Sequence, residues 1–165
     1  MGWLSYENQK WGYRLSYPGR WQIIEAKVAQ EKKGAWSGDV LFDGELRKVT
    51  FGEPGNNMWP GGFQVIVLCN PKKWTLREWL MHYEIRDVSG GDLIQEVEET
   101  SLGDRPARLL KIFMFDHQGL EIIASHRGLI YKLIFAGNNP NDPEAPKHKL
   151  IYRQMVSSFR FLRER

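Results

Sequence analysis

Short runs in which apolar and polar residues alternate recur along this chain, and they constrain its fold more than any other feature. In residues 12–18, the apolar Tyr13, Leu15 and Tyr17 alternate with polar neighbours. A period of two is typical of a strand that buries one face. Further short strands are predicted at 21–25, 40–42, 48–51, 62–69, 94–101, 107–115, 120–126 and 129–135. We therefore expect a chain built mainly from strands, with about six to eight of them in a central sheet.

The clearest helix signal begins at Thr75. Glu78 follows three residues later, and this spacing predicts a capping box, in which each side chain satisfies a backbone donor. Trp74 and Trp79 have the spacing of a hydrophobic staple across the same start. The sequence therefore predicts a capped helix near 75–86.

A second helix is predicted near 147–158. Its apolar stripe includes Ile151, Tyr152, Met155 and Phe159. A group of strands precedes each helix, and this order indicates an α+β fold with an antiparallel sheet. No repeat, low-complexity tract or linker interrupts residues 1–165, so we expect a single domain.

Turn residues predict which neighbouring strands pair. Pro18-Gly19 predicts a hairpin between the two strands that flank it. Asp43-Gly44 likewise predicts that the strands before and after it form a pair.

The aromatic content excludes intrinsic disorder. The 165 residues include 7 Trp, 6 Tyr and 8 Phe, together 13% of the chain, whereas disordered chains are poor in such residues. No apolar run approaches the roughly 18 residues of a membrane-spanning helix, so we expect a soluble chain. The single cysteine, Cys69, excludes an intrachain disulfide.

Charge is distributed unevenly along the chain. The net charge of +3 is too small to indicate a nucleic-acid-binding protein. Residues 84–104 contain seven acidic residues and one basic residue, whereas residues 144–165 contain six basic and two acidic residues. These segments are interpreted either as two solvated faces or as oppositely charged surfaces for a protein partner.

The histidines are scattered, and no metal site is expected. They are His82, His117, His126 and His148, with no His-x-x-x-His or Cys-x-x-Cys spacing. Residues 116–119 predict a four-residue hairpin turn. This turn would place His126 opposite Leu109 and far from His117.

No catalytic or cofactor-binding motif is found. The chain has no Gly-x-Ser-x-Gly elbow, and residues 52–55 lack the Gly-Lys-Ser/Thr of a phosphate-binding loop. Cys69 follows an apolar strand, where a free cysteine usually behaves as a small buried hydrophobe. We therefore expect no catalytic residues, no cofactor and no enzymatic activity.

Two segments combine basic and aromatic residues, as surfaces that bind nucleic acid do. They are 72–74 (Lys-Lys-Trp) and 160–163 (Arg-Phe-Leu-Arg). Trp74 is already explained by the staple. Alternation near the C-terminal end favours an edge strand with Phe159 and Phe161 pointing inward. Nucleic acid is therefore not the expected partner.

Two tryptophans lie in glycine-rich loops and have no predicted core role. Trp36 lies in the 30–38 loop, and Trp59 follows Asn56 and Asn57 in the 52–62 loop. Such residues either fold back over an edge of the core or anchor a partner. If they anchor a partner, these four residues form the candidate binding surface.

Both ends of the chain carry a recognisable aromatic pattern. The start reads Tyr6-x4-Trp11-Gly12-Tyr13-x-Leu15-x-Tyr17-Pro18-x2-Trp21, and the end reads Tyr152-x5-Ser158-Phe159-x-Phe161. This pattern resembles the PsbP-like superfamily, which includes the extrinsic PsbP subunit of photosystem II, DcrB-like lipoproteins and a Ran-binding import factor. The resemblance implies an α/β/α sandwich and a noncatalytic binding or assembly role.

The sequence and the resemblance together predict a noncatalytic binding or accessory domain of an exported bacterial protein or lipoprotein. The alternative is a small cytoplasmic ligand-binding protein or an enzyme of unknown reaction. No basic and apolar signal peptide follows Met1, so export would depend on a segment that precedes this sequence. We expect another protein as the partner, membrane contact only through such an anchor, and a location in the cell envelope rather than the cytoplasm.

Overall fold

The computed structural model describes residues 2–28, 40–41, 45–54, 62–83, 93–114, 117–136 and 143–163. The first strands are β1 (Trp3–Asn8), β2 (Tyr13–Pro18), β3 (Gln22–Glu25), β4 (Lys27–Val28), β5 (Val40–Leu41), β6 (Glu45–Gly52) and β7 (Gly62–Cys69). They are followed by α1 (Leu76–Tyr83), β8 (Leu93–Leu102), β9 (Arg105–Met114), β10 (His117–His126), β11 (Leu129–Ala136), α2 (Ala145–Ser158) and β12 (Arg160–Phe161).

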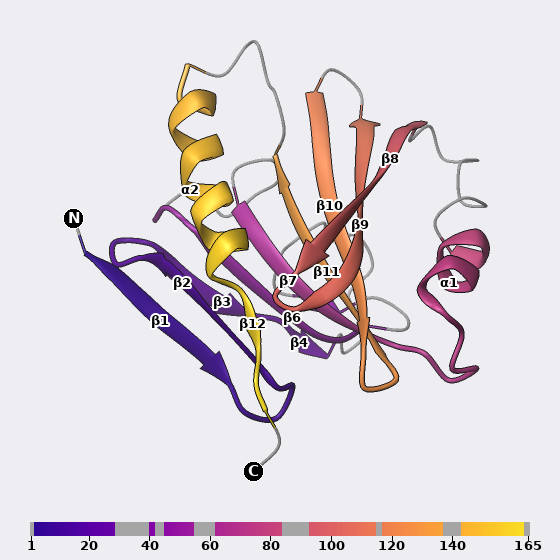
Figure 1. Cartoon of the computed structure of the whole chain (residues 1–165). Helices are drawn as coiled ribbons and strands as arrows, with labels where there is room; N and C mark the ends of the chain where they lie inside the picture. Colours follow the sequence, from indigo (N-terminus) through magenta and orange to yellow (C-terminus); the bar gives the residue numbers. More distant parts are fainter. Residues whose placement is uncertain are drawn as a thin grey trace.

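A seven-stranded antiparallel sheet forms the centre of the fold, in the order β3-β6-β7-β11-β10-β9-β8. A second antiparallel sheet has the order β1-β2-β12, so the C-terminal strand lies beside the N-terminal pair (Figure 1). The short β4 and β5 pair in parallel. The expectation of an α+β fold with a mainly antiparallel sheet is confirmed.

The two faces of the large sheet carry separate hydrophobic cores. Along β10, Ile122 and Ala124 belong to one core and Ile123 to the other, as strand alternation requires. We call the first the aromatic core; it includes Tyr13, Phe51, Phe63, Tyr131, Tyr152 and Phe159. The second, which we call the α1 core, consists of Trp79, Leu80, Leu110, Ile112, Ile123 and Ile130. The expected α/β/α sandwich is therefore confirmed, with α2 and α1 on opposite sides of the sheet (Figure 1).

The start of α1 has the predicted capping box. Thr75 donates from its backbone N–H and from its hydroxyl to Glu78 Oε2, each at 2.8 Å. Glu78 N–H donates to Thr75 Oγ1 at 3.3 Å. Trp74 packs against the α1 core, which contains Trp79, so both partners of the expected staple contact that core. The predicted end of this helix at 86 lies outside the described residues.

The C-terminal helix α2 starts at Ala145, two residues before the predicted start. Pro146 lies in its first turn, where the missing proline N–H would have no intrahelical acceptor. Tyr152 and Met155 are buried in the aromatic core, as the apolar stripe predicted.

The two hairpins predicted in the first half of the chain are wrong. Pro18-Gly19 is followed by a corner between the two sheets, because β2 pairs with β1 and β12 whereas β3 pairs with β6. Similarly, β5 pairs with β4, and β6 pairs with β3 and β7. A turn dipeptide indicates where a strand ends but does not specify which strand it pairs with. Phe42, Asp43 and Gly44 lie outside the described residues.

The predicted four-residue turn at 116–119 is also wrong. β10 already begins at His117, which pairs with Met114. Gly119 lies within the strand, buried between Ile112 and Ala136, so this glycine occupies a strand rather than a turn. The register consequently places Leu109 opposite Ile122 rather than opposite His126.

Candidate functional site

The four residues of the sequence-based binding surface, Trp36, Asn56, Asn57 and Trp59, lie outside the described residues. That surface therefore remains a prediction. Cys69 ends β7 as a partly exposed free thiol rather than the buried residue expected. Within the described ranges, no group of three or more His, Cys, Asp or Glu residues could hold a metal ion.

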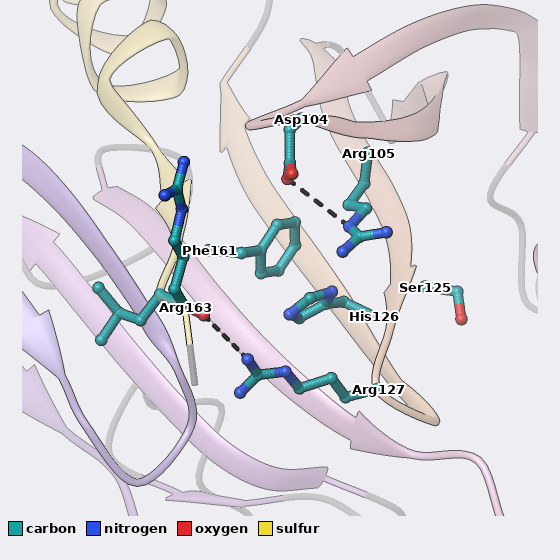
Figure 2. A pocket seen from close by; sticks show the side chains of 8 residues that line it. Asp104, Arg105, Ser125, His126, Arg127, Phe161 and Arg163 are labelled. Carbon is teal, nitrogen blue, oxygen red and sulfur yellow. Dashed lines mark hydrogen bonds and ion pairs between the residues drawn. The ribbon is translucent and has the colours of Figure 1, made fainter. Parts of the chain in front are cut away.

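A surface pocket of about 440 Å³ lies where two hairpin turns meet the C-terminal strand (Figure 2). We call it the arginine pocket. It is lined by Asp104, Arg105, Ser125, His126, Arg127, Phe161, Leu162 and Arg163. The lining comes from the β8–β9 turn, the β10–β11 turn and β12 with the residues after it.

The β10–β11 turn positions Arg127 in an unusual backbone conformation. His126 pairs with Leu129, so Arg127 and Gly128 form a two-residue turn. Their φ angles are +53° and +73°, as a type I′ turn requires. Asparagine or glycine usually occupies the first of these positions, and a residue with a Cβ is disfavoured there by about 1 kcal/mol.

The Arg127 side chain holds the C-terminal strand in place. Its Nη2 donates to the carbonyl oxygen of Leu162 at 3.1 Å, as Figure 2 shows. On the other side of the strand, Leu162 N–H donates to the carbonyl oxygen of Gly12 at 2.8 Å. The backbone of residue 162 is thus hydrogen-bonded both to Gly12 beside the small sheet and to Arg127 in the β10–β11 turn.

The β8–β9 turn approaches the same strand closely. Leu102 pairs with Arg105, and Gly103 between them has a φ of +60°. A Cβ at Gly103 would lie 3.4 Å from the Phe161 ring and 3.5 Å from the Phe159 carbonyl oxygen. Glycine therefore suits this position through both its backbone conformation and the short distance to the strand.

Aromatic rings form the floor of the arginine pocket. The buried His126 ring lies 4.2 Å from the Phe161 ring, measured between centroids. Phe161 in turn lies edge-on to Tyr131 at 5.0 Å. Tyr131 donates its hydroxyl to the carbonyl oxygen of Trp11 at 2.7 Å, and burial raises the pKa of this phenol. The floor is therefore continuous with the aromatic core.

The rim of the arginine pocket is positively charged. Among the described residues that line it, three are arginines and one, Asp104, has a carboxylate. Arg105 Nε lies 3.6 Å from Asp104 Oδ1, and both side chains are largely exposed. An exposed pair at this distance contributes little stability, so the guanidinium is accessible to another anion.

Ser125 and His126 are the lining residues of the arginine pocket that a nucleophile and its base would require. Ser125 and His126 are consecutive in a strand, so their side chains point to opposite faces of the sheet. Figure 2 shows the Ser125 hydroxyl directed away from the His126 ring. These two residues therefore cannot form the hydrogen-bonded pair of nucleophile and base that acyl transfer requires.

A second pocket of about 360 Å³ lies on the other side of the C-terminal strand. We call it the serine pocket. It is lined by Ser5, Arg14, Leu15, Ser16, Ser158 and Arg160. Three of its lining residues already serve the fold, because Ser16 N–H donates to Ser158 Oγ and Arg160 Nη1 donates to the Ser157 and Phe159 carbonyl oxygens.

The arginine pocket is only partly predictable from the sequence. The segment 160–163 was singled out for its basic and aromatic residues, and the structure confirms the predicted edge strand, with Phe159 buried and Phe161 partly buried. Arg127 was missed because arginine is not a typical residue of a type I′ turn. The meeting of two turns with this strand depends on pairing that no local pattern reveals.

No protein-family model matches the chain, and neither does any curated protein. Among solved structures, it is similar to cyanobacterial PsbP (CyanoP) from Synechocystis sp. PCC 6803, with 17% identity and a TM-score of 0.61. That alignment covers 96% of this chain and 92% of CyanoP. A crystal structure from Bacteroides thetaiotaomicron VPI-5482 is similar at 12% identity and a TM-score of 0.53, over 97% of this chain and 48% of that one.

Among the described residues, no helix is long and apolar enough to cross a membrane. The resemblance noted at the two ends of the sequence is confirmed as a likeness of fold, and it extends over nearly the whole chain. This chain has a PsbP-like fold.

Proposed function

We propose that this chain is a noncatalytic binding domain that acts as an accessory or assembly factor for another protein. The observation that carries the proposal is the arginine pocket, which combines exposed cations with a fixed aromatic floor. Arginine and aromatic residues are enriched at the centres of protein interfaces. The PsbP-like fold supports the same role, because the resemblance implies binding rather than catalysis.

The composition of the arginine pocket favours a protein partner over a small metabolite. Pockets for small molecules are mostly apolar and enclose their ligand. Here Phe161 and Leu162 are the apolar members of the lining, and the others are charged or polar. The alternative role as a small ligand-binding protein remains the second candidate, because the volume of about 440 Å³ is large enough for a metabolite.

We further propose that the domain works in a bacterial cell envelope, held there by a segment outside this sequence. The support is the resemblance to a superfamily with exported and lipid-anchored members. Fractionation of the native cells tests this part: the protein is expected with the envelope or the periplasm. Recovery in the cytoplasm alone would contradict it.

Site-specific photo-crosslinking in native cells tests the binding function. Asp104 at the rim of the arginine pocket is replaced by p-benzoylphenylalanine, and the exposed Leu150 on α2 is replaced in the same way as a matched control. A discrete protein adduct is expected from position 104 and not from position 150. The same adducts from both positions, or none from position 104, would contradict the proposed function.

A further inference from the structure

We propose that the arginine pocket binds an acidic segment of the partner polypeptide, with carboxylates of that segment paired to Arg105 and to Arg163. This inference rests on the proposed function, from which it takes the binding of another protein. It adds the chemistry that the partner must present: a carboxylate next to an apolar side chain.

The charge of the arginine pocket is the first reason to expect an acidic ligand. The lining of the arginine pocket carries two more positive than negative charges when His126 is neutral. The whole chain of 165 residues carries a net charge of only +3. Positive charge is therefore concentrated at this pocket, and such a concentration attracts and orients an anionic partner.

The second reason to expect an acidic ligand is that Arg105 and Arg163 are available to pair with it. Within the described parts of the chain, Arg163 forms no ion pair, and Arg105 has only the loose contact of 3.6 Å with Asp104. Arg127, by contrast, is committed to the Leu162 carbonyl oxygen. Incoming carboxylates can therefore pair with Arg105 and with Arg163 without breaking a bond that holds the strand.

A carboxylate is the anion that an acidic polypeptide presents to such arginines. A guanidinium group presents two parallel donors that match the two oxygens of a carboxylate. Glutamate or aspartate side chains therefore fit Arg105 and Arg163, and competition with inorganic phosphate distinguishes them from a phosphate group.

Phe161 gives the reason for an apolar neighbour in the ligand. Its ring is only partly buried and lies against His126 at the floor of the arginine pocket; Figure 2 shows it between Arg163 and Arg105. An apolar side chain beside the bound carboxylate would cover this ring and remove its surface from water. A free ion would leave the ring exposed.

Fluorescence anisotropy with a defined peptide tests the inference. The probe is a labelled octapeptide in which two glutamates flank one phenylalanine, and the control probe carries glutamines instead. The test variant is Arg105→Gln/Arg163→Gln. A matched control, Arg77→Gln/Arg153→Gln, makes the same change of charge at exposed positions on α1 and α2.

The glutamate peptide is expected to bind the wild-type chain, and the Arg105→Gln/Arg163→Gln variant should bind it about tenfold or more weakly. The matched control should lose less than about twofold at 0.15 M salt, and the glutamine peptide should not bind. Equal weakening in both double variants, or binding of both peptides alike, would overturn the inference. Circular dichroism of the folded variants excludes unfolding as the cause of a loss.

Two further experiments distinguish an acidic peptide from other anionic ligands. Inorganic phosphate at 1 mM should leave the peptide bound, and vesicles of anionic phospholipid should not bind through Arg105 and Arg163. Displacement by phosphate, or vesicle binding that the test variant abolishes, would overturn the choice of an acidic polypeptide. A discrete adduct from position 104 without peptide binding would leave the binding function standing and reject this inference alone.

Discussion

The aromatic core and the arginine pocket meet along residues 159–163, yet they use side chains in opposite ways. Phe159, directly after α2, is fully buried and stacks on Tyr13 at 5.6 Å. Phe161 is only partly buried and forms the floor of the pocket, and Arg163 is exposed at its rim. Within five residues the chain passes from core to binding surface. Stability and binding are therefore assigned to different residues of one segment, and substitutions should separate them.

The largest effect on stability is expected in the aromatic core. Phe159→Ala removes a ring that contacts both Tyr13 and Phe161, and such a cavity should lower the free energy of unfolding by about 3–5 kcal/mol. Urea unfolding followed by circular dichroism measures this change. A loss below about 1 kcal/mol would show that the segment does not anchor the core.

A smaller loss of stability is expected from a substitution in the core on the other face of the sheet. Leu110 is buried in the α1 core, and Leu110→Ala should lower the free energy of unfolding by about 2–3 kcal/mol. The same urea experiment measures it. If Leu110→Ala destabilised the chain more than Phe159→Ala, the aromatic core would not be the dominant one.

The cap of α1 should contribute less than either core. Thr75→Ala removes the hydroxyl that accepts from Glu78 N–H, and loss of an N-cap of this kind lowers the free energy of unfolding by about 1 kcal/mol. Serine at the same position serves as the control, since it keeps the hydroxyl. A Thr75→Ser variant as unstable as Thr75→Ala would contradict the capping role.

The same cap makes a prediction about pH. Hydrogen bonds from Thr75 to the carboxylate hold the pKa of Glu78 below its ordinary value. A pKa lowered in the folded state stabilises the fold at pH values above the unfolded-state pKa, and this contribution is lost as the pH falls through the folded-state pKa. Side-chain NMR titration should show the pKa of Glu78 rising toward its ordinary value in Thr75→Ala. An unchanged pKa would contradict this account.

The residues of the aromatic core were predictable because burial leaves a periodic trace in the sequence. Alternation identified Tyr13, Leu15 and Tyr17, and capping chemistry identified the start of α1, since both depend on neighbours in sequence. Strand pairing was less predictable. β2 joins β12 from the far end of the chain, and a period of two gives no information about the partner strand.

For a related reason, the location of the arginine pocket could hardly be predicted from the sequence. Its lining comes from three segments that only the sheet order brings together. Exposed arginines have no periodicity, and Arg127 stands where a different residue is typical of the turn. Trp36 and Trp59 are candidates from the sequence because no core role explains them there, and that criterion cannot find a site made of charged residues.

The smallest effect on stability, and the most direct test of the central claim, comes from Arg105→Gln/Arg163→Gln. Its urea midpoint is measured with and without the glutamate peptide. Without peptide, the free energy of unfolding should match that of the wild type within about 0.5 kcal/mol. Peptide at 100 times its dissociation constant for the wild type should stabilise the wild type by about 2.7 kcal/mol and the variant, which binds about tenfold or more weakly, by about 1.4 kcal/mol or less. Equal stabilisation of both proteins, or a variant that unfolds much earlier without peptide, would contradict the separation of binding from stability.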